Sequence, residues 1–193
     1  MLKKEKKVKK EVLIVLFMAG IMIFSVVGFI WTNSATQKLE YNGYSFLITN
    51  NGYLLNYQKK QVFFSYFPEQ LTDLEINPEV KSTLLNKYEI DFTYDINDTL
   101  KQEIALMHYN MQPVLSDFLK IYLRQGLTSN NTFKVPIISC NTATPAVPVL
   151  YVKQLNETKI TLNGNCVIAE IKDARDVVVV KERLLYSLLG VME

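Results

Sequence analysis

The longest apolar run in the chain lies near its N-terminus. Residues 12–31, VLIVLFMAGIMIFSVVGFIW, contain no charged side chain. At a helical rise of about 1.5 Å per residue, such a run covers roughly the 30 Å hydrocarbon core of a bilayer. The pattern therefore predicts a transmembrane helix over residues 12–31, with the lipid bilayer as its partner.

Charges on the two sides of this run predict its orientation. Residues 1–11 form a basic tail with six lysines, whereas Lys38 is the one basic residue in the twenty positions that follow the run. An excess of lysine marks the cytoplasmic side of a membrane helix. We therefore expect a single-pass protein of the cell membrane, with a cytoplasmic N-terminus, a linker over residues 32–40 and an extracytoplasmic domain over residues 41–193.

Two alternatives start from the same segment. A cleaved signal peptide has an apolar region of about 7 to 15 residues and a small-x-small cleavage site. The run here is longer, and Ser34 and Ala35 do not form a good site. The order of basic residues, Glu11 and an apolar run also resembles a type IV pilin leader. That family has Gly or Ala before the cleavage point, which here would follow Lys6.

Beyond the linker, short aromatic and β-branched runs alternate with turn residues. Asn77 and Pro78 are typical of a helix start and predict a short helix through Asn86. The runs themselves predict strands at residues 44–49, 53–57, 61–67, 88–94, 134–140, 147–153, 158–162 and 166–172.

Two longer helices follow from apolar residues spaced three and four apart. One begins near Asn97, is expected to kink or split at Pro113, and ends near Gly126; the other covers the end of the chain after Asp173 or Asp176. The order of elements predicts an α+β fold, in which an N-terminal transmembrane helix is followed by one mixed, mostly antiparallel sheet domain with packed helices.

Composition narrows the possible functions. The chain has 21 basic and 19 acidic residues, and without the six lysines and two glutamates of residues 1–11 the balance becomes 15 to 17, or −2. This argues against nucleic acid as a partner, because phosphate binding needs clustered cations. One His, two Cys and seven Gly leave little for a metal site or a phosphate-binding loop. We therefore assign no metal, no cofactor and no catalytic residue.

Cys140 and Cys166 are the two cysteines of the chain, and each lies at the end of a predicted strand. In an extracytoplasmic domain this arrangement favours one structural disulfide. Buried free thiols are an alternative. A redox or nucleophilic role is a third, although the chain has no CxxC motif.

Other side chains with chemical potential have ordinary structural interpretations. His108 lies beside an apolar helical stripe, where a packed histidine is commoner than a base. Aspartates could form an acid–base pair but more often cap helices or face solvent; they are Asp91, Asp95, Asp98, Asp117, Asp173 and Asp176. Aromatic runs could bind a sugar or a peptide, or could form sheet core; they comprise Tyr41, Tyr44, Phe46, Tyr53, Tyr57, Phe63, Phe64, Tyr66 and Phe67.

Three N-x-[ST] motifs begin at Asn97, Asn130 and Asn156, and all fall in predicted turns. The motif is the acceptor for N-glycosylation in exported proteins. We therefore predict that these asparagines are possible glycosylation sites.

The segments VPIISCNTATPAVPVLYV, NETKITLNGNCVIAEI and ERLLYSLLGVM lie within residues 134–192. They resemble uncharacterised single-pass membrane-anchored proteins of archaea. In those proteins a Cys before a Pro-containing stretch and a Cys in a hydrophobic strand precede a C-terminal helix. The resemblance implies an anchored extracellular domain that retains Cys140 and Cys166, and it carries no known activity.

Taken together, these patterns predict a membrane-anchored extracytoplasmic domain of structural or interaction type, with a protein or surface glycan as partner. The alternatives are a cell-surface hydrolase with an unidentified site and a pilin-like surface subunit.

Overall fold

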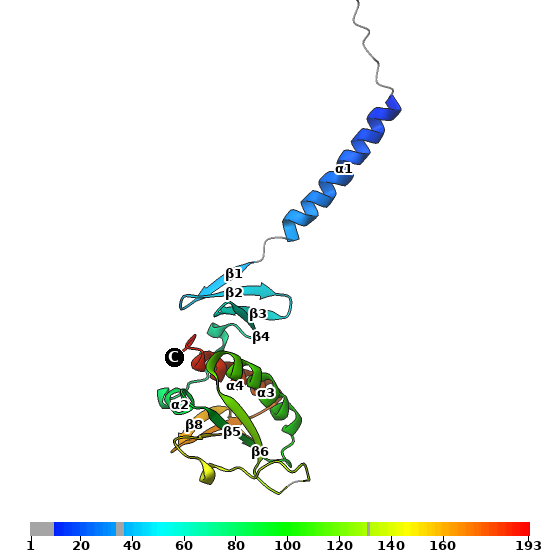
Figure 1. Ribbon diagram of the computed structural model, residues 1–193. Helices are drawn as coiled ribbons and strands as arrows, with labels where there is room; N and C mark the ends of the chain where they lie inside the picture. Colours follow the sequence, from blue (N-terminus) through cyan, green and yellow to red (C-terminus); the bar gives the residue numbers. More distant parts are fainter. Residues whose placement is uncertain (1–9, 34–36, 131) are drawn as a thin grey trace, which may run out of the picture. The chain divides into compact units, whose positions relative to one another are not determined.

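The computed structural model describes residues 10–33, 37–130 and 132–193 (Figure 1). The chain divides into two compact units, Met1–Gln37 and Lys38–Glu193. The first unit contains helix α1, Lys10–Asn33. The second contains all of the strands and the remaining helices.

The transmembrane prediction for residues 12–31 is wrong for the described chain. A helix forms there, but no helix among the described residues is long and apolar enough to cross a membrane. The single-pass location in the cell membrane, with an extracytoplasmic domain, is corrected with it. The lipid bilayer as a partner stays a prediction.

The charge argument for orientation and the pilin-like alternative both depend on the N-terminal tail. Residues 1–9, which carry most of its lysines, lie outside the described residues. The same holds for residues 34–36 of the predicted linker, whereas the structure begins its first strand at Lys38 within that linker.

The first sheet is an antiparallel meander with the order β1-β2-β3-β4. Hairpin turns of two residues join the strands, and Asn42, Gly43, Gln58 and Lys59 adopt the positive φ angles that such turns need. The strands are β1 Lys38–Tyr41, β2 Tyr44–Thr49, β3 Gly52–Tyr57 and β4 Lys60–Phe64.

The second sheet has five strands in the order β6-β5-β7-β9-β8, and all pairs except β8–β9 are parallel. Its strands are β5 Glu89–Tyr94, β6 Tyr122–Leu127, β7 Val149–Gln154, β8 Lys159–Asn163 and β9 Cys166–Ile171. The helical segments of this unit are η1 Pro68–Leu71, α2 Pro78–Leu84, α3 Lys101–Val114, η2 Leu115–Leu119, η3 Cys140–Thr142 and α4 Ala174–Leu188.

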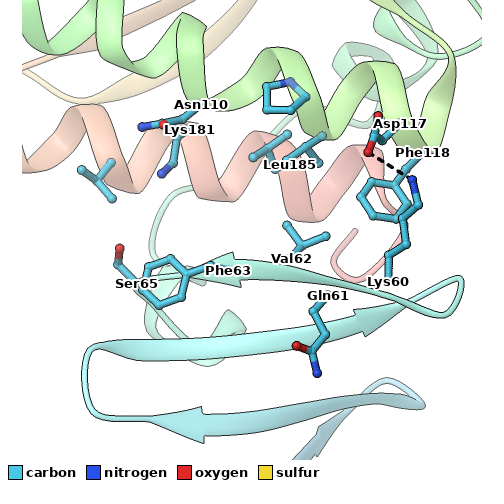
Figure 2. Close-up of a pocket in the computed structure, with 13 residues that line it drawn as sticks. Lys60, Gln61, Val62, Phe63, Ser65, Asn110, Asp117, Phe118, Lys181 and Leu185 are labelled. Carbon is cyan, nitrogen blue, oxygen red and sulfur yellow. Dashed lines mark hydrogen bonds and ion pairs between the residues drawn. The ribbon is translucent and has the colours of Figure 1, made fainter.

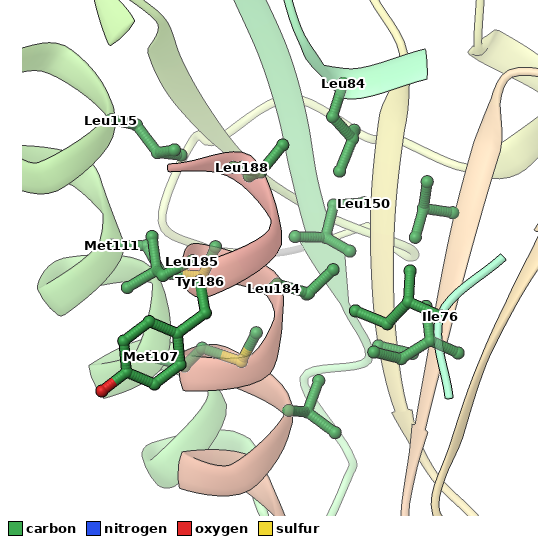
Figure 3. Close-up of a cluster of buried hydrophobic side chains, with 14 of the residues drawn as sticks. Ile76, Leu84, Met107, Met111, Leu115, Leu150, Leu184, Leu185, Tyr186 and Leu188 are labelled. Atoms are coloured by element: carbon green, nitrogen blue, oxygen red, sulfur yellow. The ribbon is translucent and has the colours of Figure 1, made fainter. Parts of the chain in front are cut away.

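Helices α3 and α4 lie between the two sheets (Figure 1). On the meander side, the ring of Tyr186 in α4 stacks on Phe64 of β4 with ring centroids 4.0 Å apart. On the other side, α4 packs with α3 and the large sheet, as Figure 3 shows for Met107, Leu184 and Leu150. Because α4 is covered on both sides, its residues from Glu182 to Leu188 are all buried.

The prediction of one mostly antiparallel sheet is also wrong, because α3 and α4 separate two sheets and the larger one is mostly parallel. Alternation of apolar residues shows which face of a strand is buried, but it does not show which strands pair. The parallel pair β5–β6 arises because α3 carries the chain back along the sheet before β6 begins.

Two predicted elements change type. The long helix ends near Leu119, where Lys120 adopts φ 60° and stops it, so that Tyr122 to Gly126 belong to β6. Residues 134–140 form no strand; Ile137 makes a single parallel bridge to Leu127. By contrast, Asn77 caps α2 and Asp173 caps α4, which confirms both predicted helix starts.

Candidate functional site

Strand β4 lies at the edge of the meander and exposes backbone groups. Gln58 and Lys59 both have positive φ, 48° and 67°, which is typical of a two-residue hairpin closed by Tyr57 and Lys60. Hydrogen-bonded and non-hydrogen-bonded pairs then alternate along β3–β4. This alternation directs the N–H and C=O groups of Gln61 away from β3, and those of Phe63 with them.

A groove of about 540 Å³ runs between β4 and the helices α3 and α4 (Figure 2). Its centre is apolar, because Val62 of β4 faces Leu185 of α4 and Val114 of α3 also lines it. Phe63 is 50% exposed at the groove and presents a large apolar surface there. The groove therefore joins a free strand edge to an apolar floor.

The carboxylate of Glu182 on α4 continues this edge just beyond β4. Its two oxygens accept the backbone N–H groups of Ser65 at 2.9 Å and Tyr66 at 2.8 Å, and the residue is fully buried. Ser65 follows Phe63 by two positions, so its N–H has the same direction as the free N–H groups of β4. Glu182 thus stands where the carbonyl oxygen of a neighbouring strand would accept.

Tyr186 of α4 also holds the segment that follows β4. Its phenol donates a hydrogen bond to the carbonyl oxygen of Tyr66 at 2.8 Å. Burial raises the pKa of Tyr186, and the nearby Glu182 carboxylate raises it further, so the phenol stays neutral and keeps its proton. The segment after β4 is therefore held to α4 by two side chains one helical turn apart.

Each end of the groove is polar. Lys181 of α4 and Asn110 of α3 lie near each other at one end, and the ammonium of Lys181 is 3.4 Å from a Glu182 oxygen. At the other end, Lys60 binds Asp117 at 3.1 Å and lies 5.6 Å from the ring centroid of Phe118. The Lys60 and Asp117 side chains are 60% and 53% exposed, so this pair contributes little stability.

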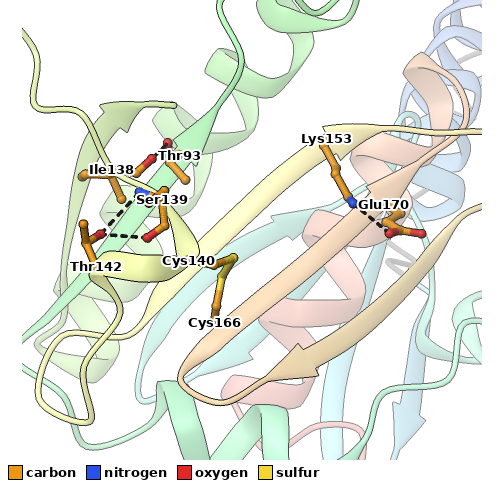
Figure 4. The surroundings of a disulfide bond; sticks show 8 residues. All are labelled: Thr93, Ile138, Ser139, Cys140, Thr142, Lys153, Cys166 and Glu170. Carbon is orange, nitrogen blue, oxygen red and sulfur yellow. Dashed lines mark hydrogen bonds and ion pairs between the residues drawn. A yellow bond between two sulfur atoms is a disulfide. The ribbon is translucent and has the colours of Figure 1, made fainter. Parts of the chain in front are cut away.

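The structure confirms the predicted disulfide between Cys140 and Cys166 (Figure 4), with Cα atoms 5.2 Å apart. It joins η3 to the first residue of β9 and packs with Ile138 and Val149 in a small second core. Val167, next along β9, points into the main core, so the disulfide lies on the sheet face away from α3 and α4. Its place indicates a structural role in holding the β6–β7 connection to the sheet.

His108 is a packed residue of α3. Its Nε2 atom lies 2.9 Å from the carbonyl oxygen of Leu123, and its ring centroid lies 5.2 Å from that of Phe92. Burial lowers the pKa of His108, although the hydrogen bond to Leu123 opposes this shift. The neutral ring therefore ties α3 to β6, as the packed interpretation predicted.

The predicted aspartates are dispersed, and each has a local partner. Asp91 is buried and binds Arg124 through two hydrogen bonds of 2.7 and 2.9 Å. Asp95 accepts from Asn97, Asp98 from the backbone of Gln154, Asp117 from Lys60, Asp173 from the first turn of α4, and Asp176 from Thr158. Within the described ranges, no group of three or more His, Cys, Asp or Glu residues could hold a metal ion.

The asparagines of the three N-x-[ST] motifs, Asn97, Asn130 and Asn156, are exposed. Asn97 also donates a side-chain hydrogen bond to Asp95 at 3.2 Å. Residue 131, in the middle of the second motif, lies outside the described residues. Glycosylation at these positions stays a prediction.

Sequence reasoning missed residues that define the groove and its edge, among them Gln61, Lys181 and the buried Glu182 next to it. The role of Gln61 depends on strand order, and those of Lys181 and Glu182 depend on what packs against α4. One signal was present in the run QVFFSYF, where Phe63 places a large apolar side chain between the buried Val62 and Phe64. Of the other predicted aromatic residues, the phenylalanines are buried in the main core and the tyrosines are partly buried against it.

The chain matches no protein-family model, no curated protein and no solved structure. The resemblance of residues 134–192 to archaeal proteins stays a prediction.

Proposed function

We propose that the protein is an interaction module that binds an extended segment of a partner protein by strand addition to β4. The observation that carries this proposal is the free edge of β4 beside an apolar groove. An edge strand offers unpaired N–H and C=O groups to another strand, and a neighbouring groove selects the side chains of that strand.

The other sheet edges are less suited to this role. Strand β1 has four residues, two of them charged. The edge of β6 is met by Ile137 through its bridge to Leu127, and β8 begins with Lys159, whose ammonium pairs with Glu157 and Glu170. Among these four edges, β4 is the one that borders the groove of about 540 Å³.

The backbone geometry specifies the contacts. An added strand would pair with the N–H and C=O groups of Gln61 and Phe63. Each hydrogen bond contributes about 0.5 to 1.5 kcal/mol net, so backbone pairing alone gives weak binding and the groove must supply the rest. The carboxylate of Glu182 already satisfies Ser65, which ends the available edge at that point.

The test uses a random-peptide display library on the full chain, followed by affinity measurements on resynthesised peptides. Gln61→Pro removes one outward N–H and places a ring on the edge, while the ladder to β3 stays intact. We expect enriched peptides to lose at least about tenfold in affinity, since a lost hydrogen bond and a steric clash both oppose pairing. Gln61→Ala keeps the N–H and is the matched control, with a change below about twofold.

Hydrogen exchange supplies the second measurement. Peptide binding should protect the amides of Gln61 and Phe63, while the Val62 amide, already paired to β3, should change little. Peptides that bind Gln61→Pro as well as the unmodified chain contradict the proposal, and so does a selection without enrichment. Self-association abolished by Gln61→Pro would assign the edge to a second copy and overturn the proposal of a separate partner.

A further inference from the structure

We infer that the bound segment carries an apolar side chain facing Val62 and an acidic side chain two positions away, which binds Lys181 and Asn110. This inference rests on the proposed function and adds the chemistry of the partner to it. It follows from the alternation of side chains along a strand and from the residues on each side of the groove.

The apolar position follows from the register of strand addition. Side chains directly opposite each other on paired strands lie on the same face. The residue opposite Val62 therefore points into the centre of the groove, toward Leu185 (Figure 2). Val114 also lines the groove. A branched apolar side chain buries its surface there without leaving a polar group unpaired.

The acidic position follows from the residues at the end of the groove nearest Ser65. A side chain two positions along the added strand lies on the same face and reaches Lys181 and Asn110, which lie near each other in Figure 2. The Lys181 side chain is 14% exposed, whereas Glu182 behind it is fully buried. A partner strand therefore meets the ammonium before it meets the carboxylate.

The hydrogen-bonding capacity of this end matches a carboxylate. An ammonium has three donors, and the contact of Lys181 with Glu182 at 3.4 Å uses one of them. The two carboxylate oxygens of Glu182 already accept hydrogen bonds from two backbone N–H groups. The amide of Asn110 adds further N–H donors, and charge-assisted hydrogen bonds are the stronger kind.

The opposite end of the groove does not offer the same selectivity. There Lys60 is paired one-to-one with Asp117, and both side chains are largely exposed. An acidic group at that end would compete with Asp117 for Lys60, and solvent would screen the gain. The inference therefore places the acidic residue specifically toward Ser65.

The experiment uses the peptides enriched by display, resynthesised with Asp, Asn or Lys at each position in turn. In the unmodified chain, Asp should bind at least about fivefold more tightly than Asn at the position two residues from the required apolar residue. Lys181→Met keeps the apolar stem but removes the charge, and should reduce this preference to below about twofold. Lys181→Arg should retain it, since the charge remains.

Lys60→Met is the matched control, because it makes the same charge change at the other end of the groove. The Asp preference should survive it. If Lys60→Met and Lys181→Met reduce the preference equally, the effect reflects overall charge and the inference fails. Peptides that need the Gln61 N–H but show no Asp preference overturn the inference and leave strand addition standing, whereas peptides insensitive to Gln61→Pro overturn both.

Discussion

The buried carboxylate of Glu182 offers the sharpest test of how the meander is attached to α4. The substitution Glu182→Gln keeps the size of the side chain and replaces one oxygen by an NH2 group. Because both oxygens accept backbone N–H groups, one from Ser65 and one from Tyr66, the amide leaves one of these donors facing another donor. The chain must then break one hydrogen bond or move the segment after β4.

The expected magnitude follows from these two contacts. A hydrogen bond to a charged group contributes about 1.5 to 3 kcal/mol, and one to a neutral acceptor about 0.5 to 1.5 kcal/mol. Glu182→Gln loses one charged bond and weakens the other, but Ser65 is exposed and its N–H can be rehydrated. We therefore expect the free energy of unfolding to fall by about 2 to 3 kcal/mol.

The assay is equilibrium unfolding of the full chain in denaturant near pH 7, with hydrogen exchange to locate the change. The amides of Ser65 and Tyr66 should exchange faster in the variant. Glu157→Gln is the matched control, because Glu157 is largely exposed and accepts from the exposed ammonium group of Lys159. Such partners are worth about 0 to 1 kcal/mol. Equal losses in the two variants would refute the assigned role of Glu182.

Two further predictions concern the disulfide and the histidine. Cys140→Ser or Cys166→Ser opens a loop of 26 residues, so each should lower the free energy of unfolding by about 3.5 kcal/mol, and the double variant little more, as measured in denaturant. Burial lowers the pKa of His108 in the folded chain, so between about pH 6.5 and that lower pKa the unfolded chain binds more protons. The free energy of unfolding should therefore fall as the pH drops through this window. His108→Gln should remove this part of the pH dependence.

A specific experimental result would contradict each of these two predictions. Two labelled thiols in the unreduced, unfolded protein, or additive losses in the double cysteine variant, would contradict the disulfide. For the histidine, an identical pH dependence of unfolding in the unmodified chain and in His108→Gln would show that the ring is equally protonated in both states.

Local structure in this protein follows largely from neighbouring residues. The strands of the β2–β3 hairpin, the cap of Asn77 on α2 and the cap of Asp173 on α4 could be predicted because each depends on a few adjacent positions. The disulfide was predicted as a pair because the chain has two cysteines and each lies at a strand end. These features need no knowledge of how distant segments pack.

Strand β6 shows where local pattern fails. The residues Leu115, Phe118 and Tyr122 continue a helical spacing, yet the helix stops at Lys120 and Tyr122 begins a strand beside β5. Parallel pairing with β5 stabilises the strand, and so does close packing of Ile138 against Gly126. The approach is so close that a Cβ at Gly126 would lie 2.6 Å from an Ile138 side-chain carbon. Tertiary contacts therefore override helix spacing at this point.

The candidate site is the part that only the tertiary structure decided. By sequence, Gln61 is a polar strand residue and Glu182 a charged helix residue 121 positions later. They become one site because the meander ends at β4 and α4 lies between two sheets. Which strand lies at the edge of a sheet depends on how the strands pair. A helix that is covered on both sides can bury a carboxylate only where N–H groups from elsewhere in the chain bind it. Such long-range pairing leaves no periodic trace in the sequence.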